Sequence, residues 1–200
     1  MKKTILLFVI FTTFGYQAQN LVSFGPTIGF NAYDIEIEGP LIAGGAVSGL
    51  NIGGFVDYQL SRGFGARALL TYNTIKENEY ALTSNGTYNV LSSDSELKTL
   101  QLQGLMRYDT AGDYNKGFYL TGGFRMVNVL SAKIDGNDGE DFYKKTSFAA
   151  LLGFGVTISR TVGLELMGDA SITSTLENAK TKNYGICANL TVDLSSVFTK

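Results

Sequence analysis

Residues 118–131 read FYLTGGFRMVNVLS, and apolar and more polar positions alternate along this stretch with a period of two. Phe118, Leu120 and Phe124 fall on one side of the pattern, while Thr121 and Arg125 fall on the other. Successive side chains of a β-strand point to opposite faces, so this period is typical of a strand with one apolar and one mixed face. The stretch therefore predicts a strand that separates two different environments.

The same alternation recurs along the chain and predicts about eight strands. They lie near residues 21–32, 46–60, 64–76, 97–109, 117–132, 145–159, 162–175 and 183–195. Short connections near 61–63, 111–116 and 160–161 alternate with longer ones over 33–45, 77–96, 133–144 and 176–182. An even number of antiparallel strands, with short turns at one end and long loops at the other, is the layout of an outer-membrane barrel. We predict an all-β fold, an eight-stranded antiparallel up-and-down transmembrane β-barrel.

The N-terminus has the pattern of a secretory signal peptide. Lys2 and Lys3 precede an apolar run from Ile5 to Phe14, and small and polar residues lead to Ala18. A membrane-spanning helix needs about 20 apolar residues, which is more than this run provides. We therefore expect a cleaved signal peptide over 1–18, a barrel domain over 19–200, and export to the bacterial outer membrane.

Composition narrows the possible functions. The chain contains no histidine and a single cysteine, Cys187, so Ser-His or Cys-His nucleophile pairs and multi-thiolate metal sites are unavailable. The 16 basic and 18 acidic residues lack the basic excess expected of a nucleic-acid-binding protein. We therefore predict no enzymatic activity, no cofactor and no nucleic-acid partner.

Aromatic girdles at the two membrane interfaces are an independent expectation for such a barrel, because aromatic rings favour that zone. Aromatic residues do occur on the apolar face near the predicted strand ends. The predicted girdle consists of Phe24, Phe30, Tyr58, Phe64, Tyr72, Tyr108, Phe118, Phe148 and Tyr184.

The opposite row of side chains would line the lumen of the barrel and contains both signs of charge. Its charged members are Asp57, Arg67, Arg107, Arg125, Glu165, Asp169 and Asp193. A barrel of about eight strands is filled by its own side chains, and buried charges must be paired or hydrated. We predict a plugged lumen with a network of ion pairs between strands. A narrow ion or proton path through these charges is the alternative interpretation.

One loop concentrates carboxylates and could hold Ca²⁺ through oxygen ligands. Its candidate ligands are Asp135, Asn137, Asp138, Glu140 and Asp141. The spacing does not match an EF-hand, so we interpret the segment chiefly as a solvated extracellular loop and predict no metal site.

Several short motifs resemble those of the small outer-membrane barrels of the OmpA/OmpX-like superfamily, and especially the PorT-like barrels common in Bacteroidetes. They are GPTIGFN at 25–31, GGFVDY at 53–58, FYLTGG at 118–123 and LGFG at 152–155. The resemblance covers essentially the whole chain after the signal peptide. It implies a membrane-embedded barrel without shared catalytic residues, and some relatives are tied to protein secretion.

The leading hypothesis is a non-enzymatic outer-membrane barrel with a structural or surface-interaction role through its long extracellular loops. Its partners would be outer-membrane lipid, the outer-membrane assembly machinery, and a surface or secretion-system protein. Two alternatives remain open at this stage. One is a narrow ion-conducting or secretion-accessory barrel, and the other is a soluble exported lipocalin-like barrel that turns its apolar row inward around an apolar ligand.

Overall fold

The computed structural model describes residues 22–38, 42–44, 46–84, 87–177 and 180–195. The predicted signal peptide over 1–18 lies outside the described residues. Within them, no helix is long and apolar enough to cross a bilayer.

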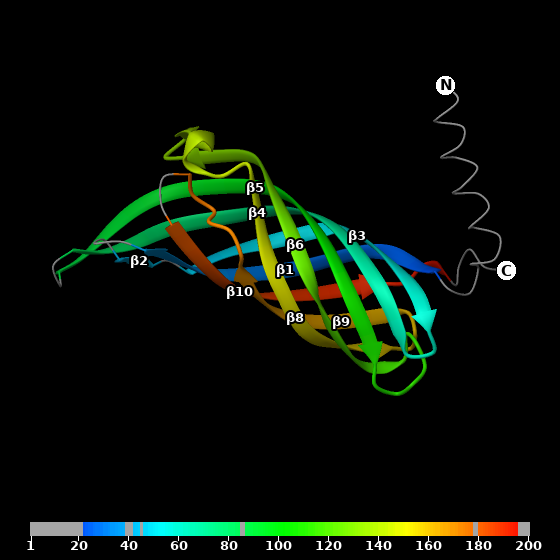
Figure 1. Cartoon of the computed structure of the whole chain (residues 1–200). Helices are drawn as coiled ribbons and strands as arrows, with labels where there is room; N and C mark the ends of the chain where they lie inside the picture. Colours follow the sequence, from blue (N-terminus) through cyan, green and yellow to red (C-terminus); the bar gives the residue numbers. More distant parts are fainter. Residues whose placement is uncertain (1–21, 39–41, 45, 85–86, 178–179, 196–200) are drawn as a thin grey trace, which may run out of the picture.

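The described chain forms a closed barrel of eight long antiparallel strands, as the sequence predicted (Figure 1). These strands are β1 (Val22–Glu38), β3 (Ala46–Ser61), β4 (Phe64–Ser84), β5 (Thr87–Asp109), β6 (Gly117–Ile134), β8 (Thr146–Ile158), β9 (Val162–Ser171) and β10 (Lys180–Val192). Each pairs with its sequence neighbours, and β1 pairs with β10 to close the cylinder. Closure leaves no unpaired edge within the barrel wall, which the absence of water in a bilayer requires.

Three small elements belong to the long-loop end. They are β2 (Ile42–Gly44), β7 (Asn137–Asp138) and the 3-10 helix η1 (Glu140–Phe142). The tight turns after Ser61, Asp109 and Ile158 lie at the other end, where β1 begins and β10 ends. The three short connections therefore share one end of the barrel, as predicted.

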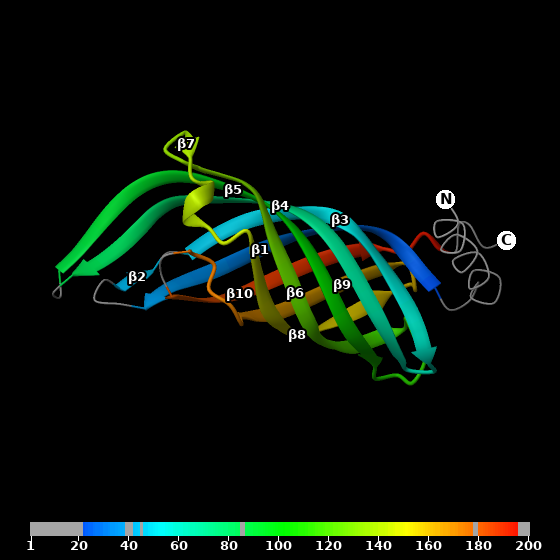
Figure 2. The same ribbon diagram turned by 45° about the horizontal axis from the view of Figure 1, so that its top comes forward.

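Two predicted loops are largely strand in the structure. In the predicted loop 33–45, β1 continues to Glu38 and β2 occupies Ile42–Gly44. Residues 77–96 were expected to form a loop, whereas β4 and β5 continue through most of this segment as one hairpin in which Ser84 pairs with Thr87. Figures 1 and 2 show this hairpin extending well beyond the rest of the barrel. The dipeptide Asn85-Gly86 is a strong hairpin signal that would have predicted the extension.

The apolar row faces outward and the mixed row faces inward. Leu152, Leu50 and Phe124 have exposed fractions of 76%, 66% and 65%, whereas Arg107 and Gln101 are almost completely buried. This orientation is the reverse of a water-soluble barrel, because it places apolar side chains on the surface and polar ones in the interior. It excludes the lipocalin-like alternative.

The pairing of β5 with β6 shifts register between Lys98 and Thr99. Thr99 pairs with Val129 and Lys98 with Ser131, so Leu130 is the extra residue of a β-bulge. The bulge lies near the long-loop end, where the lumen opens.

Candidate functional site

The lumen near the short-turn end contains an ion-pair network built on Arg67. The Arg67 guanidinium donates from Nε to Asp57 Oδ1 at 2.6 Å and from Nη2 to Asp57 Oδ2 at 2.7 Å. Its third nitrogen, Nη1, donates to Glu165 Oε2 at 2.9 Å. One arginine thus links β3, β4 and β9 across the barrel. Bidentate arginine pairs of this kind fix geometry as well as charge.

Arg107 forms the second half of this network. It donates to Asp109 Oδ1 at 2.7 Å, to Thr157 Oγ1 at 2.9 Å and to Asp57 Oδ2 at 3.4 Å. Its guanidinium carbon lies 3.8 Å from the ring centroid of Tyr119, and that of Arg67 lies 5.5 Å from the same ring. Tyr119 therefore contributes cation–π attraction to both arginines.

A glycine makes room for this tyrosine. A Cβ at Gly155 would overlap the Tyr119 phenol, whose side chain is fully buried. The backbone of β8 can approach the ring only because this position has no side chain. Gly155 in the strand-like alternation of 145–159 thus has a packing role.

Asp109 is a network member that the sequence reasoning missed. It follows Arg107 by two positions and so belongs to the same inward row, but it sits at the last residue of β5. Extending the alternation by one position would have found it. With Asp57, Glu165 and Asp109 against Arg67 and Arg107, three carboxylates face two guanidinium groups.

Tyr114 from the turn between β5 and β6 covers the network at the short-turn end. Its ring centroid lies 5.0 Å from the Arg107 guanidinium carbon. Burial raises the pKa of the Tyr114 phenol above its ordinary value, so the phenol stays neutral. The turn thus adds a neutral aromatic cover to a charged interior.

A layer of apolar side chains separates this network from the rest of the lumen. It is formed by Phe55, Leu69, Leu105, Leu151, Met167 and Cys187. Leu69, Met167 and Cys187 have no measurable exposure, so the layer is tightly filled. A dry apolar layer opposes the passage of hydrated ions.

Above this layer, Arg125 forms the second charged group of the lumen. It is ion-paired with Asp169 and donates from Nη1 to the Tyr33 hydroxyl at 2.7 Å. The guanidinium carbon lies 5.1 Å from the Tyr33 ring centroid. A Cβ at Gly185 would overlap that ring, so this glycine lets Tyr33 lie against β10.

Asparagines beside this pair form a hydrogen-bonded chain that the sequence reasoning did not anticipate. Asn51 donates to Asn31 Oδ1 at 3.0 Å, and Asn31 donates to Asn73 Oδ1 at 2.5 Å. The thiol of Cys187 also donates to Asn31 Oδ1. The alternation in the sequence could have predicted that these side chains face the lumen, because all three asparagines occupy its inward positions.

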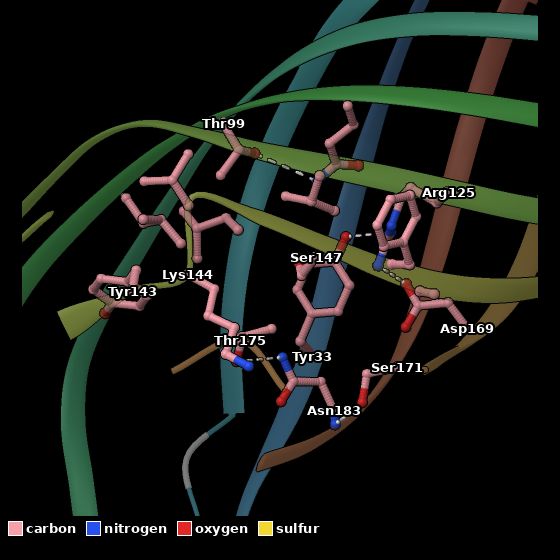
Figure 3. A pocket seen from close by; sticks show the side chains of 17 residues that line it. Tyr33, Thr99, Arg125, Tyr143, Lys144, Ser147, Asp169, Ser171, Thr175 and Asn183 are labelled. Carbon is pink, nitrogen blue, oxygen red and sulfur yellow. Dashed lines mark hydrogen bonds and ion pairs between the residues drawn. The ribbon is translucent and has the colours of Figure 1, made fainter. Parts of the chain in front are cut away.

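A cavity of about 80 Å³ lies above Arg125 and Asp169, at the long-loop end of the lumen (Figure 3). Its apolar walls include Ile75, Leu97, Val127 and Val129. The segment before β8 and the β9–β10 connection contribute Lys144 and Thr175, and the backbone N–H of Lys144 donates to the Thr175 carbonyl at 2.8 Å. This contact joins the two loops into a roof.

The seven predicted lumen charges are all buried, and the structure divides them into three groups. Asp57, Arg67, Arg107 and Glu165 share the first network, while Arg125 and Asp169 form the separate upper pair. Asp193 has no ion pair with an arginine among the described residues; it accepts from Asn115 Nδ2 at 3.0 Å and from the Ser195 backbone N–H at 2.8 Å. Asn115 accepts in turn from Thr157, to which Arg107 donates, so Asp193 reaches the first network indirectly.

The predicted girdle residues all lie on the outer surface. Their exposed fractions range from 38% to 52%. Phe24, Phe64, Tyr108 and Phe118 lie close to strand ends, whereas Phe30 and Tyr72 lie near the middle of β1 and β4, because these strands continue beyond their predicted ends. Phe118 additionally stacks on Phe154, with ring centroids 5.8 Å apart. Contact of these rings with lipid head groups stays a prediction.

The acidic loop is exposed and makes local hydrogen bonds. Asn137 donates to the Asp135 carbonyl at 3.4 Å, and the Glu140 backbone N–H donates to Asp138 Oδ1 at 3.1 Å. Asp141 lies in the short helix η1. Over the part of the chain that the structure describes, no three His, Cys, Asp or Glu residues group as a metal site would require.

An eight-stranded closed barrel with an apolar exterior and a polar, packed lumen defines a transmembrane β-barrel of the outer-membrane class. The chain belongs to the outer membrane protein beta-barrel domain family, whose sequence profile matches residues 17–177. It is therefore a protein of the bacterial outer membrane.

Solved structures with the same fold include Neisserial surface protein A, which has 16% sequence identity and a TM-score of 0.59 over 86% of this chain and 97% of that one. Ail of Yersinia pestis, solved with the heparin analogue sucrose octasulfate, has 13% identity and a TM-score of 0.46 over 86% and 99% of the two chains. OprG from Pseudomonas aeruginosa has 13% identity and a TM-score of 0.45 over 86% and 92%. Comparison with curated protein sequences finds no significant match.

The layered lumen predicts that the purified barrel conducts poorly. In planar bilayers we expect no discrete channel openings, because the apolar layer around Leu69 and Met167 lies beside a network of paired charges. Single-channel recording in symmetric potassium chloride measures this directly, with empty bilayers as the control. Discrete openings that scale with salt concentration would instead favour the ion-conducting alternative.

Proposed function

We propose that the protein is a non-enzymatic outer-membrane barrel with a surface-interaction role, and that the extended β4–β5 hairpin is its contact element. The observation that carries the proposal is the free edge of this hairpin. Residues 87–94 of β5 lie beside β4 on one side, whereas the pairing of β5 with β6 begins only at Ser95. No other described strand pairs with this segment.

The backbone of an edge strand offers unpaired N–H and C=O groups that can add a further strand. Native proteins usually block such an edge with proline, charge or a covering element. The segment reads TYNVLSSD, with no proline and one charge. The opposite edge of the hairpin is covered, because β2 pairs with residues 81–83 of β4. The open edge therefore suits an extended segment of a partner protein.

The resemblance to PorT-like barrels, some of which are tied to secretion, supports a surface or secretion-system protein as this partner. Lipid and the outer-membrane assembly machinery would be the partners of the barrel wall. A catalytic role has little support, because the chain has no histidine and the buried carboxylates Asp57, Glu165 and Asp169 are engaged by arginines.

Shortening the hairpin tests this role. Glu77 and Ser95 are paired, so an Asn-Gly turn can replace residues 78–94 without changing the barrel wall. We expect the shortened protein still to fold, so that boiled and unboiled samples migrate differently on a detergent gel, and to reach the outer membrane. It should lose its contact with the partner protein. The barrel persists because the deleted residues lie beyond the closed cylinder.

A photo-crosslinking residue introduced at Asn89 on the free edge should give an adduct with a discrete protein in intact cells. The matched control is the same residue at Asn137, which is exposed at the long-loop end but lies in β7, outside the hairpin. Equal labelling at both positions, or shortening that changes neither crosslinking nor the detergent sensitivity of the envelope, would remove the support for the hairpin as a contact element.

A further inference from the structure

We propose that the cavity above Arg125 and Asp169 binds a small zwitterionic amphiphile, namely an α-amino acid with an aliphatic side chain. The proposal concerns the lumen and does not depend on the hairpin. It rests on three properties of the cavity: hydrogen-bonding groups left without partners, a cation without a carboxylate, and an aliphatic wall.

The first property is a set of oxygen acceptors that lack hydrogen-bond donors among the described residues. They are Asp169 Oδ1, Gln101 Oε1 and Asn183 Oδ1, and all three residues line the cavity. Asp169 is 7% exposed and Gln101 is 2% exposed, so both residues are buried. A buried acceptor without a donor is energetically costly, so such groups point to a missing donor. The ammonium group of an amino acid supplies three N–H donors.

The second property is an unpaired cation together with an unpaired N–H donor. Arg125 Nε is buried and has no acceptor among the described residues, although the other nitrogens of this guanidinium contact Asp169 and Tyr33. Lys144 lies on the roof, and none of the described carboxylates is within ion-pair distance of it. Figure 3 shows its side chain extending toward Thr175 and Asn183. Because Arg125 is balanced by Asp169, the lining has a net positive charge that a ligand carboxylate would neutralise.

The third property is the aliphatic wall. Ile75, Leu97, Val127 and Val129 line one part of the cavity, and Ala149 lines another. A ligand with only charged groups would leave this wall without apolar contact. A branched aliphatic side chain would bury its apolar surface against this wall, which favours binding.

Size agrees with this class of ligand. One buried water needs a cavity of at least about 10–15 Å³, so the cavity of about 80 Å³ has room for more than a single water. A small organic ligand can therefore occupy it. The roof residues Tyr143 and Lys144 are only partly buried, so the ligand would enter from the extracellular side.

Calorimetric titration of the folded barrel in detergent micelles with L-leucine tests the proposal. We expect saturable binding, and at least about tenfold weaker binding of 4-methylpentanoate, which lacks the ammonium group, and of 3-methylbutylamine, which lacks the carboxylate. Glycine should also bind at least about tenfold more weakly, because it lacks the apolar side chain. No heat from L-leucine up to about 10 mM, or equal affinity for all four compounds, would overturn the proposal.

Two glutamines on β5 provide a matched pair of variants. Gln101 and Gln103 are both 2% exposed and both have an unpartnered Oε1, but only Gln101 lines the cavity. We expect Gln101→Leu to weaken L-leucine binding at least about tenfold and Gln103→Leu to change it less than about twofold. If Gln101→Leu does not fold, Lys144→Gln on the roof is the substitute variant. We expect it to weaken L-leucine binding by the same factor. Equal effects of Gln101→Leu and Gln103→Leu, or unchanged binding in the cavity variant, would contradict the assigned ligand.

Discussion

Replacing Arg67 by methionine is expected to lower the free energy of unfolding by about 3–5 kcal/mol, because it leaves buried carboxylates uncompensated. Asp57 would keep only its 3.4 Å contact with Arg107, and Glu165 would lose its ion pair. Methionine retains most of the side-chain volume, so the loss reports charge rather than a cavity. Denaturant titration in phospholipid vesicles, followed by the heat-dependent gel shift, measures the change.

Arg62→Met is the matched control for this substitution. Arg62 lies in the tight turn, its side chain is 89% exposed, and it meets Asp113 at 3.6 Å. Exposed pairs contribute about 0–1 kcal/mol, so this variant should remain close to wild type. Adding Asp57→Asn and Glu165→Gln to Arg67→Met should recover part of the lost stability. Equal losses for Arg62→Met and Arg67→Met would show that the network does not hold the barrel together.

Replacing Leu152 by arginine is expected to cost about 2–4 kcal/mol in a lipid bilayer, since a charge on the lipid face must leave water. Leu152 lies in the middle of β8, and its exposed fraction of 76% is the highest among the large apolar residues. On a water-soluble protein the same substitution would be nearly neutral. Unfolding titrations in vesicles therefore measure the contact of this surface with lipid.

Phe142→Arg tests the same change outside the barrel wall. Phe142 is also largely exposed, at 61%, but it lies in η1 at the long-loop end. We expect its effect to stay within about 0.5 kcal/mol, as for ordinary surface substitutions. If Leu152→Arg were as mild as Phe142→Arg, the row that contains Leu152 would not face hydrocarbon.

The barrel itself could be predicted because its two faces meet different solvents. The alternation in residues 118–131 follows from the need to place Phe124 against lipid and Arg125 against the lumen, and the structure places both residues as predicted. The eight strands and the asymmetry of their connections follow from the same period and from turn residues. The extended β4–β5 hairpin differs from the prediction because its polar residues resemble those of a loop and lack the alternation of the barrel wall.

The candidate sites were predictable only as a list of inward residues. Arg67, Arg107 and Arg125 share one row in the sequence, yet two of them enter one network and the third pairs alone with Asp169. Which carboxylate each one meets depends on strand tilt and on contacts across the lumen, such as the one between β4 and β9. Period-two alternation contains no information about either.

The amino-acid sequence alone thus determined the fold class, the direction of each face and the number of barrel strands, because these depend on the local alternation of apolar and polar side chains. Only the tertiary structure decided the ion-pair partners, the apolar layer, the cavity above Arg125 and the free edge of β5. These features arise from register and closure, which bring residues such as Arg67 and Glu165 together although 98 positions separate them in the chain.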